Sequence, residues 1–407
     1  MLLFRPQEFF NTIHLKSVLY FFPLNPADKN SGSISRALSL LRYFKSRGLS
    51  VDFISKQAWG NYTPKSIAAF EESGLANKLW VFSRKPVKKN PLVYFFTYKL
   101  RHMLFKATLR LEKGSIPNHT TLHLRNQFDA LLQQKKYDFI IISYAYWADL
   151  IKDNPFLSDA ITIIDTHDLL TSQHQHDKGF NRSVAIADEL RRVAQFRQIW
   201  AISVEEAYFF RQFFKERVFY IPMMMDDPAT TTEGSRTKEF DLIYVATDNP
   251  HNLASAKWFF DNVYPLLAAE LKICVIGTIL EHVPKSGNIT GVAFAEDLTK
   301  YYSRSRIAIC PMLSGTGLKI KVVEALANGL PVVCTEAGID GLPDKTNNGC
   351  YVANDAAGFA GYIGILLGDE QLYKQQSSAG RTCFKRNFDT TGVYKKIDAA
   401  LNLSANE

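Results

Sequence analysis

The chain has 407 residues, of which 46% are hydrophobic and 22% charged, with a formal net charge of +8. This composition is that of a globular protein and excludes a disordered or fibrous one, and the length predicts two domains. No run approaches eighteen consecutive apolar residues, so no membrane-spanning helix is expected. The five cysteines contain no C-x2-C pair. They predict buried thiols in a reducing compartment, and neither a disulfide set nor a zinc site.

Apolar segments with the length of strands alternate with helical patterns along the whole chain. This alternation predicts an α/β protein with two Rossmann-like domains, each a parallel sheet covered by helices on both faces. The expected strands are 18–22, 51–54, 79–82, 139–143, 161–165, 199–202, 218–221, 242–245, 273–276, 306–310, 331–334 and 349–352.

The predicted domain boundary lies in a polar, turn-rich stretch between Pro222 and Lys238. We therefore expect an N-terminal domain of residues 1–225, a C-terminal domain of residues 226–390, and a final helical segment, 391–407. Charge supports the division, because residues 1–222 contain 31 Lys and Arg against 19 Asp and Glu, a net charge of +12. A uniformly solvated surface would not concentrate positive charge in one half.

The most informative segment is 311–342, which follows an apolar strand pattern at 306–310. Gly315, Thr316 and Gly317 form a predicted turn between this strand and a helix. Such a turn leaves backbone N–H groups pointing outward at the positive end of the helix dipole. The pattern predicts an anion site.

Charged residues follow the turn at helical spacing. Lys319 and Lys321 add two ammonium groups, and Glu324 lies about one helical turn further on. Amides and lysines suit phosphates, while a carboxylate suits a pair of ribose hydroxyls, so the segment indicates a nucleotide site. The alternative is an ordinary strand–turn–helix unit with a solvated helix face, because a lone Gly-x-Gly is a weak signal.

The whole segment resembles the donor-binding signature of GT-B-fold glycosyltransferases of the retaining family-4 type, the glycosyl transferases group 1. In that group a glycine loop, two basic residues and the phrase Glu-Ala-Leu-Ala-x-Gly-x-Pro-Val-Val recur in this order, which here spans residues 315–333. The resemblance is strong over this segment, moderate over 241–387 and weaker before it. It implies an acceptor-side N-terminal domain and a donor-binding C-terminal domain that face each other across a cleft, with the helix in 391–407 crossing back onto the N-terminal domain. It also implies no metal and no cofactor, and a nucleotide-sugar as substrate. The implied donor and phosphate-binding residues are Gly315, Thr316, Gly317, Leu318, Lys319 and Lys321, with Glu324 on the ribose.

Two departures from the family pattern concern the donor. Thr316 stands where many relatives have a second carboxylate, eight positions before Glu324. A basic pair that holds the pyrophosphate in many relatives is missing from 247–252, where the alternative is a polar loop with Asn249 as a helix cap. Phosphate binding is then expected to depend more on Lys319, Lys321 and the glycine-turn amides.

Two further loops follow predicted strands of the N-terminal half, where ligands of doubly wound sheets bind. The first contains Gly32, which the resemblance places near the donor phosphate or acceptor; the alternative is a plain helix N-terminus. The second is Asp165-Thr166-His167-Asp168. The resemblance implies that His167 lies near the donor sugar, and we name His167, Asp168 and Glu324 as the catalytic candidates. The alternative is an N-cap aspartate beside a histidine satisfied in the core.

Basic and aromatic residues alternate from 84 to 113, with nine Lys and Arg and one acid, Glu112. Part of the stretch is expected to be the core face of a helix. The combination favours docking on an anionic membrane surface over a merely solvated face or an RNA-binding patch.

Together these features predict a metal-independent enzyme that transfers a sugar from a nucleotide-sugar to a hydroxyl acceptor with retention. The expected acceptor is a glycan, a lipid-linked glycan or a protein, in bacterial glycoconjugate or surface polysaccharide synthesis. We expect a cytoplasmic protein at the inner face of the membrane and no nucleic-acid partner. The rival hypotheses are a non-catalytic GT-B homologue that acts as a binding or scaffold subunit, and a nucleotide-sugar isomerase or phosphorylase on the same fold.

Overall fold

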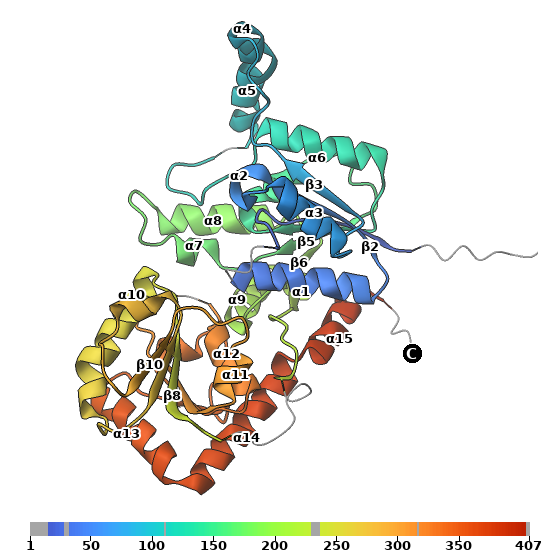
Figure 1. Ribbon diagram of the computed structural model, residues 1–407. Helices are drawn as coiled ribbons and strands as arrows, with labels where there is room; N and C mark the ends of the chain where they lie inside the picture. The colour runs from blue at the N-terminus through green and yellow to red at the C-terminus, as the bar shows by residue number, and fades with distance from the viewer. Residues whose placement is uncertain (1–14, 28–31, 110, 229–236, 316, 404–407) are drawn as a thin grey trace, which may run out of the picture. The chain divides into compact units, whose positions relative to one another are not determined.

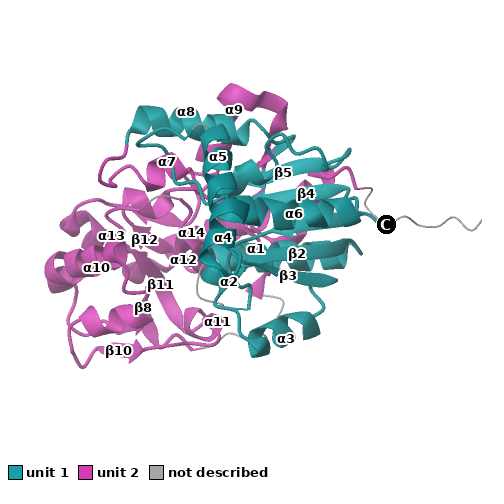
Figure 2. Ribbon diagram, turned by 90° about the horizontal axis from the view of Figure 1, so that it is seen from above, with its two compact units in different colours: residues 1–165, 181–198 teal, residues 166–180, 199–407 magenta. Residues whose placement is uncertain are grey.

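The computed structural model describes residues 15–27, 32–109, 111–228, 237–315 and 317–403. Two compact units make up the chain (Figures 1 and 2). One unit contains Met1–Asp165 and Asn181–Gln198, and the other contains Thr166–Phe180 and Ile199–Glu407. The boundary predicted at residue 225 is a different division and stays a prediction.

The first sheet has seven strands in the order β3-β2-β1-β4-β5-β6-β7, and every pairing described in it is parallel. A run of apolar residues buried on both faces forms each central strand, as expected of a parallel sheet. The strands are β1 (Ser17–Phe21), β2 (Ser50–Lys56), β3 (Lys78–Phe82), β4 (Phe139–Ser143), β5 (Ile161–Asp165), β6 (Gln198–Ala201) and β7 (Val218–Tyr220).

The second sheet has six parallel strands in the order β10-β9-β8-β11-β12-β13. They are β8 (Phe240–Val245), β9 (Ile273–Ile276), β10 (Ile289–Val292), β11 (Ser305–Cys310), β12 (Val332–Cys334) and β13 (Cys350–Val352). Two parallel-sheet α/β domains confirm the predicted fold class.

Successive residues of the second sheet pack into two different apolar clusters. Ile243 and Cys310 belong to a cluster with α12 and α14, whereas Leu242 and Ile309 belong to one with α10 and α13. Because strand side chains alternate between faces, helices cover both faces of this sheet, as predicted. The helices of the second unit are α7 (Leu170–Gln173), α9 (Val204–Phe214), α10 (Pro250–Trp258), α11 (Thr299–Tyr302), α12 (Ile320–Ala327), α13 (Ala356–Gly368), α14 (Glu370–Asn387) and α15 (Thr390–Ala400), with the short turns η3 (Lys215–Arg217), η5 (Phe259–Val263), η6 (Tyr264–Leu266), η7 (Thr278–His282) and η8 (Glu336–Ile339).

The helices of the first unit include a pair that projects beyond its strands, α4 and α5 (Figure 1). The set is α1 (Gly32–Ser46), α2 (Gln57–Gly60), α3 (Pro64–Glu72), α4 (Pro91–Tyr94), η1 (Phe95–Lys99), α5 (Leu100–Thr108), α6 (Leu122–Gln134), η2 (Ala145–Leu150) and α8 (Arg182–Val193). Among the residues that the structure describes, no helix is both long and apolar enough to cross a bilayer. All five cysteines are free thiols, four of them buried.

One strand end differs from its prediction. Asp165 was expected among polar residues available for chemistry, but its carboxylate pairs with Arg36 of α1 at 2.6 Å, and neither side chain is exposed. A second guanidinium nitrogen, Nε, lies 2.9 Å from the same carboxylate oxygen. The pair therefore fixes α1 to the carboxyl end of β5 within the first unit.

Breaking this pair should destabilise the protein strongly. Asp165→Asn removes a buried carboxylate charge from the guanidinium of Arg36, and breaking a buried ion pair typically costs about 3–5 kcal/mol. We expect a large fall in the urea midpoint of unfolding, and a smaller one when Arg36→Met and Asp165→Leu are combined. Asp261→Asn, which removes the exposed partner of Lys257, is the control and should cost less than about 1 kcal/mol. Equal midpoints for Asp165→Asn and wild type would contradict the assignment.

Candidate functional site

A glycine loop joins β11 to α12 in the second unit. Gly315 and Gly317 have φ of +101° and +77°, a region that favours glycine, and Lys319 precedes the first helical residue, Ile320. The predicted strand–turn–helix is thus present, although the helix begins later than the glycines. Thr316 lies outside the described residues, so its expected part in donor choice stays a prediction.

The ammonium of Lys319 holds this loop in place. Its Nζ donates to the carbonyl oxygens of Gly315 at 3.1 Å and Gly317 at 2.8 Å, and the side chain is buried. Burial lowers the pKa of Lys319, while the carboxylates of Asp340 and Asp168 favour its charged form. The lysine therefore contributes positive charge to the loop and also orients its backbone.

Lys321 points from the first turn of α12 toward the first turn of α10. Its Nζ donates to Oδ1 of Asn252 at 3.1 Å and lies 5.6 Å from the centre of the Tyr244 ring. Burial lowers the pKa of this lysine as well. The second predicted ammonium is therefore fixed by Asn252, which lies in the first turn of α10 and ends the polar stretch 247–252.

Glu324 lies one turn further along α12 and is partly buried. Its Oε2 accepts a hydrogen bond of 3.2 Å from the hydroxyl of Tyr302. Burial raises the pKa of Glu324 to about 7, against the lowering effects of Tyr302 and Lys321. A carboxyl group with this pKa changes charge near neutrality, so a ligand with hydroxyl donors would favour its ionised form.

Asp168 lies against the glycine loop. A Cβ atom added to Gly317 would be 3.3 Å from Asp168 Oδ1, and burial raises the pKa of this carboxyl group. The neighbouring His167 is buried and has φ of +61°, a strained conformation for a residue with a side chain. The structure thus brings Asp168 to the predicted phosphate loop and holds His167 in a conformation that surrounding contacts must stabilise.

A pocket of 340 Å³ opens beside these residues in the second unit. It is lined by Asp168, Leu169, Ser172, Ser203, Glu205, Glu206, Phe209, Gly317, Asp340 and Gly341. Two of the predicted site residues, Asp168 and Gly317, therefore share one cavity with three carboxylates that the sequence did not single out.

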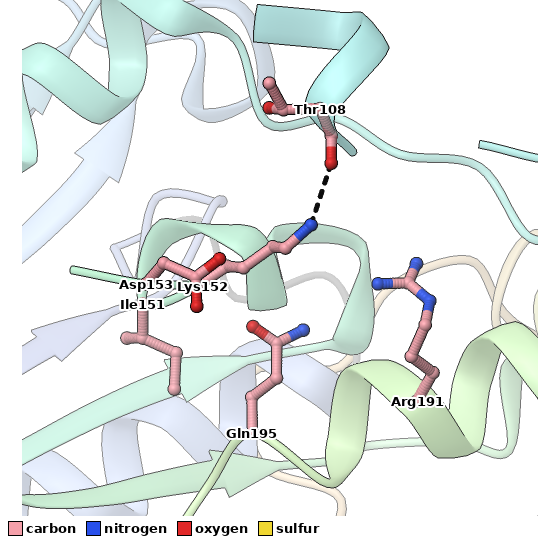
Figure 3. A pocket seen from close by; sticks show the side chains of 6 residues that line it. All are labelled: Thr108, Ile151, Lys152, Asp153, Arg191 and Gln195. Atoms are coloured by element: carbon pink, nitrogen blue, oxygen red, sulfur yellow. Dashed lines mark hydrogen bonds between the residues drawn. The ribbon is translucent and has the colours of Figure 1, made fainter. Parts of the chain in front are cut away.

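A larger pocket, of 590 Å³, lies in the first unit and contains none of the predicted residues (Figure 3). There Lys152 donates a hydrogen bond of 2.9 Å to the carbonyl oxygen of Thr108. The other lining residues are Ile151, Asp153, Arg191 and Gln195. Gly32 also belongs to the first unit, where it is the first residue of α1, and its predicted role in binding stays a prediction.

Some contacts at the site were missed by local sequence patterns. His251, in the first turn of α10, has its Nδ1 2.8 Å from Ser314 Oγ, so α10 contacts the loop between β11 and α12 directly. Asn249 caps α10 by accepting from the backbone N–H of Asn252 at 2.9 Å, which confirms the capping alternative. Asp340 could have been found only as a charged residue inside the glycine-containing turn after β12.

Metal-ligating residues do not gather in the described part of the chain, where no group of three His, Cys, Asp or Glu could hold an ion. His174 Nδ1 lies 2.7 Å from Asp177 Oδ2.

Comparison with known proteins identifies the second unit most clearly. Residues 239–369 match the family described as glycosyl transferases group 1. A protein of Klebsiella pneumoniae, described as an uncharacterized 44.6 kDa protein in the cps region, is 27% identical over 163 residues. That match covers 36% of this chain and 42% of the relative, so the chain spans less than half the length of this curated relative.

Solved structures similar to the chain extend over both units. Sucrose-phosphate synthase from Thermosynechococcus elongatus has a TM-score of 0.65 at 13% identity, covering 95% of this chain and 98% of that one. HepE of Anabaena, in complex with UDP-glucose, has a TM-score of 0.64 at 14% identity, covering 95% and 99%. At these identities the similarity establishes the fold, and it confirms the predicted GT-B class.

Gly341 tests how tightly the glycine loop is packed. Its φ is +79°, and a Cβ atom there would lie 2.7 Å from Cα of Leu318, so alanine must displace the loop backbone. We expect Gly341→Ala to lower the free energy of unfolding by about 1–3 kcal/mol. Gly364→Ala on α13, with no atom within 4 Å of the new carbon, is the control and should stabilise the helix by up to about 1 kcal/mol. Thermal unfolding of both variants measures the difference; a neutral Gly341→Ala would show that the loop has room.

Proposed function

We propose, from the match of residues 239–369 to the glycosyl transferases group 1 family, that the protein transfers a sugar from a nucleotide-sugar to a hydroxyl acceptor with retention. The observation that carries the proposal is the arrangement around α12. A glycine loop, two lysines and a buried carboxylate lie in sequence along one loop and helix. Of the similar structures, HepE was solved with UDP-glucose, which fits a donor of this class.

In this proposal the lysines act on the leaving diphosphate. Lys319 and Lys321 would neutralise the charge that develops as the bond between the sugar and the phosphate breaks, a form of electrostatic stabilisation. Both ammonium groups are already fixed by hydrogen bonds to Gly317 and Asn252, so little reorganisation is needed when the charge develops. The reaction needs no metal ion in this scheme, and the nucleotide-sugar is a substrate, so no cofactor is required.

Glu324 would bind the ribose hydroxyls through its carboxylate. Its pKa of about 7 in the free protein means that bound hydroxyl donors would hold it ionised. Asp168 and His167 would lie near the donor sugar, because Asp168 contacts Gly317 of the phosphate loop. The acceptor would be a glycan, a lipid-linked glycan or a protein, and a role in surface polysaccharide synthesis fits the relative from the Klebsiella pneumoniae cps region.

Substitution of the α12 residues tests the donor site. Glu324→Ala should weaken nucleotide-sugar binding and nearly abolish transfer, and Lys319→Ala and Lys321→Ala should each lose several kcal/mol of transition-state stabilisation. A thermal-shift screen against UDP, GDP, ADP, CMP and dTDP sugars identifies the donor first, since a ligand at 100 times its Kd adds about 2.7 kcal/mol of stability. Glu281→Ala and Lys285→Ala, at exposed positions, are the matched controls.

Full kcat/KM in all three variants would remove the donor assignment. Tight nucleotide-sugar binding without turnover would favour a non-catalytic homologue. Release of free nucleotide only when acceptor is present would exclude an isomerase or phosphorylase.

We further propose that the helices α4, η1 and α5 dock on the inner face of an anionic membrane. The expectation that part of this stretch forms a core face holds for one stripe at helical spacing, in which Tyr98 of η1 and Leu109 are buried and His102 is partly buried. No residue of α4 or α5 is fully buried. The exposed apolar side chains are Val87, Leu92, Val93, Phe95, Phe96, Leu100, Met103, Leu104 and Leu111.

Basic residues accompany this apolar surface. Lys85, Lys88, Lys89 and Lys99 are all exposed, whereas Lys106 is half-buried and bonds to the carbonyl oxygen of Asn118 at 3.4 Å. Arg110 lies outside the described residues. Exposed apolar side chains next to four lysines suit the interface of an anionic bilayer, where each lysine contributes about 1 kcal/mol.

Removal of four lysines tests the membrane proposal. Lys85, Lys88, Lys89 and Lys99 changed together to Gln should lose about 4 kcal/mol of attraction to anionic vesicles. Raised salt should also weaken binding of the wild-type protein to anionic vesicles, because the Debye length is already only about 8 Å at physiological salt and shortens further. Co-sedimentation with anionic and neutral liposomes at two salt concentrations measures both effects.

The control for this experiment removes the same charge elsewhere. Lys285, Lys300, Lys374 and Lys395 are exposed lysines of the second unit, and their change to Gln should leave vesicle binding nearly intact. Equal loss in both quadruple variants, or equal binding to neutral and anionic vesicles, would rule out docking by α4 and α5.

A further inference from the structure

A cluster of aromatic residues surrounds one lysine at the carboxyl edge of the first sheet. Lys56 is the last residue of β2, Trp59 lies in α2 directly after it, and Trp147 lies in η2 after β4. Strands β2 and β4 flank β1 in the sheet, and all three run parallel. Their carboxyl ends therefore meet at one edge, where doubly wound sheets bind ligands.

The Lys56 ammonium is buried without an anion beside it. The residue is 2% exposed, and its Nζ lies 4.7 Å from the centre of the Trp59 ring and 4.8 Å from that of Trp147. Across the described ranges the ammonium makes no hydrogen bond, and no carboxylate lies within ion-pair distance. Burial, and then the charge of Arg84, lower the pKa of Lys56 to about 8, so the group is still charged at neutral pH.

Buried charges in proteins are normally paired, and ring contacts compensate only part of the lost hydration. A second donor in the cluster has the same property, because the indole N–H of Trp147 is buried and makes no hydrogen bond. An ammonium without a carboxylate partner, next to a buried N–H without an acceptor, indicates a ligand that supplies negative charge and oxygen atoms.

The part of the cluster most exposed to solvent is the indole ring of Trp59. Trp59 is 38% exposed and meets Trp147 edge to face, with ring centroids 4.9 Å apart. His119 lies 5.1 Å from Trp59, and its pKa is lowered to about 4 by burial, so it is neutral and adds no charge. The negative face of an exposed indole suits the C–H groups on one side of a sugar ring.

We infer that Lys56, Trp59 and Trp147 form a binding site for a sugar that carries an anionic group. The carboxylate or phosphate of this sugar pairs with the Lys56 ammonium, and the sugar ring lies on the exposed part of Trp59. Exposed Arg84 adds positive charge near Lys56. That the bound sugar is the acceptor of the transfer reaction rests on the proposed function; the binding itself does not.

Direct binding tests the site without any catalysis. Dissociation constants of methyl glucuronide, glucose 6-phosphate, methyl glucoside and inorganic phosphate are measured by ligand-observed NMR on the full chain. We expect both anionic sugars to bind more tightly than methyl glucoside and than phosphate alone. The tighter of the two distinguishes a carboxylate from a phosphate as the natural group.

Variants then assign the binding to its residues. Lys56→Met should weaken binding of the anionic sugars by roughly tenfold to a hundredfold, the range expected for loss of a charged hydrogen bond, and leave binding of methyl glucoside unchanged. Trp59→Ala should weaken binding of all three sugars. Lys65→Met, an exposed lysine of α3, is the matched control and should change nothing. Loss of a buried unpaired charge does not threaten folding, and Lys56→Met should unfold at or above the wild-type temperature.

Three results would overturn the inference: anionic sugars that bind no better than methyl glucoside, phosphate that binds as tightly as its sugar, or equal losses in Lys56→Met and Lys65→Met. If Lys56→Met loses anionic-sugar binding but still binds a UDP-sugar, the site at Lys56 is distinct from the proposed donor site. A chain that binds anionic sugars yet never transfers would contradict the proposed function and leave this site standing.

Discussion

The candidate donor site depends on one buried ammonium, that of Lys319. A loop containing two left-handed glycines has many accessible conformations, and its carbonyl oxygens need donors when they lie inside the protein. Lys319 supplies hydrogen bonds to two of these carbonyls, at Gly315 and Gly317. The cost of burying its charge is offset by these bonds and by the nearby carboxylates of Asp168 and Asp340. The Lys319 ammonium therefore both fixes the geometry of the loop and supplies its positive charge.

Strand positions could be predicted because central parallel strands are buried on both faces and appear as continuous apolar runs. β4, β5 and β9 begin and end where the pattern predicted. β10 (Ile289–Val292) was missed, since this strand at the edge of the sheet contains Thr290 and Gly291, both exposed, and has no such run. The signal fails where one side of a strand faces water.

Site residues could be predicted only where they lie close together in the chain. Helical spacing relates Lys319 to Glu324, and the resemblance to a known signature added their roles. The partners of these residues come from other segments: Asn252 follows β8, and Tyr302 precedes β11. Asp165 shows the converse error, because a polar strand end can indicate chemistry or a buried ion pair. Its partner, Arg36, is 129 positions away in the sequence, and local sequence patterns do not predict contacts between residues so far apart.

The projecting helices α4 and α5 have a consequence for how this chain can change over time. Core positions tolerate few substitutions, because each neighbour is matched in volume to its surroundings. α4 and α5 bury almost nothing, so their residues can be exchanged with little effect on folding of the sheet behind them. Related chains are then free to adapt this segment to different surfaces while the loop between β11 and α12 stays the same. Sequence divergence should be greatest where the first unit meets its surroundings and least around the buried ammonium of Lys319.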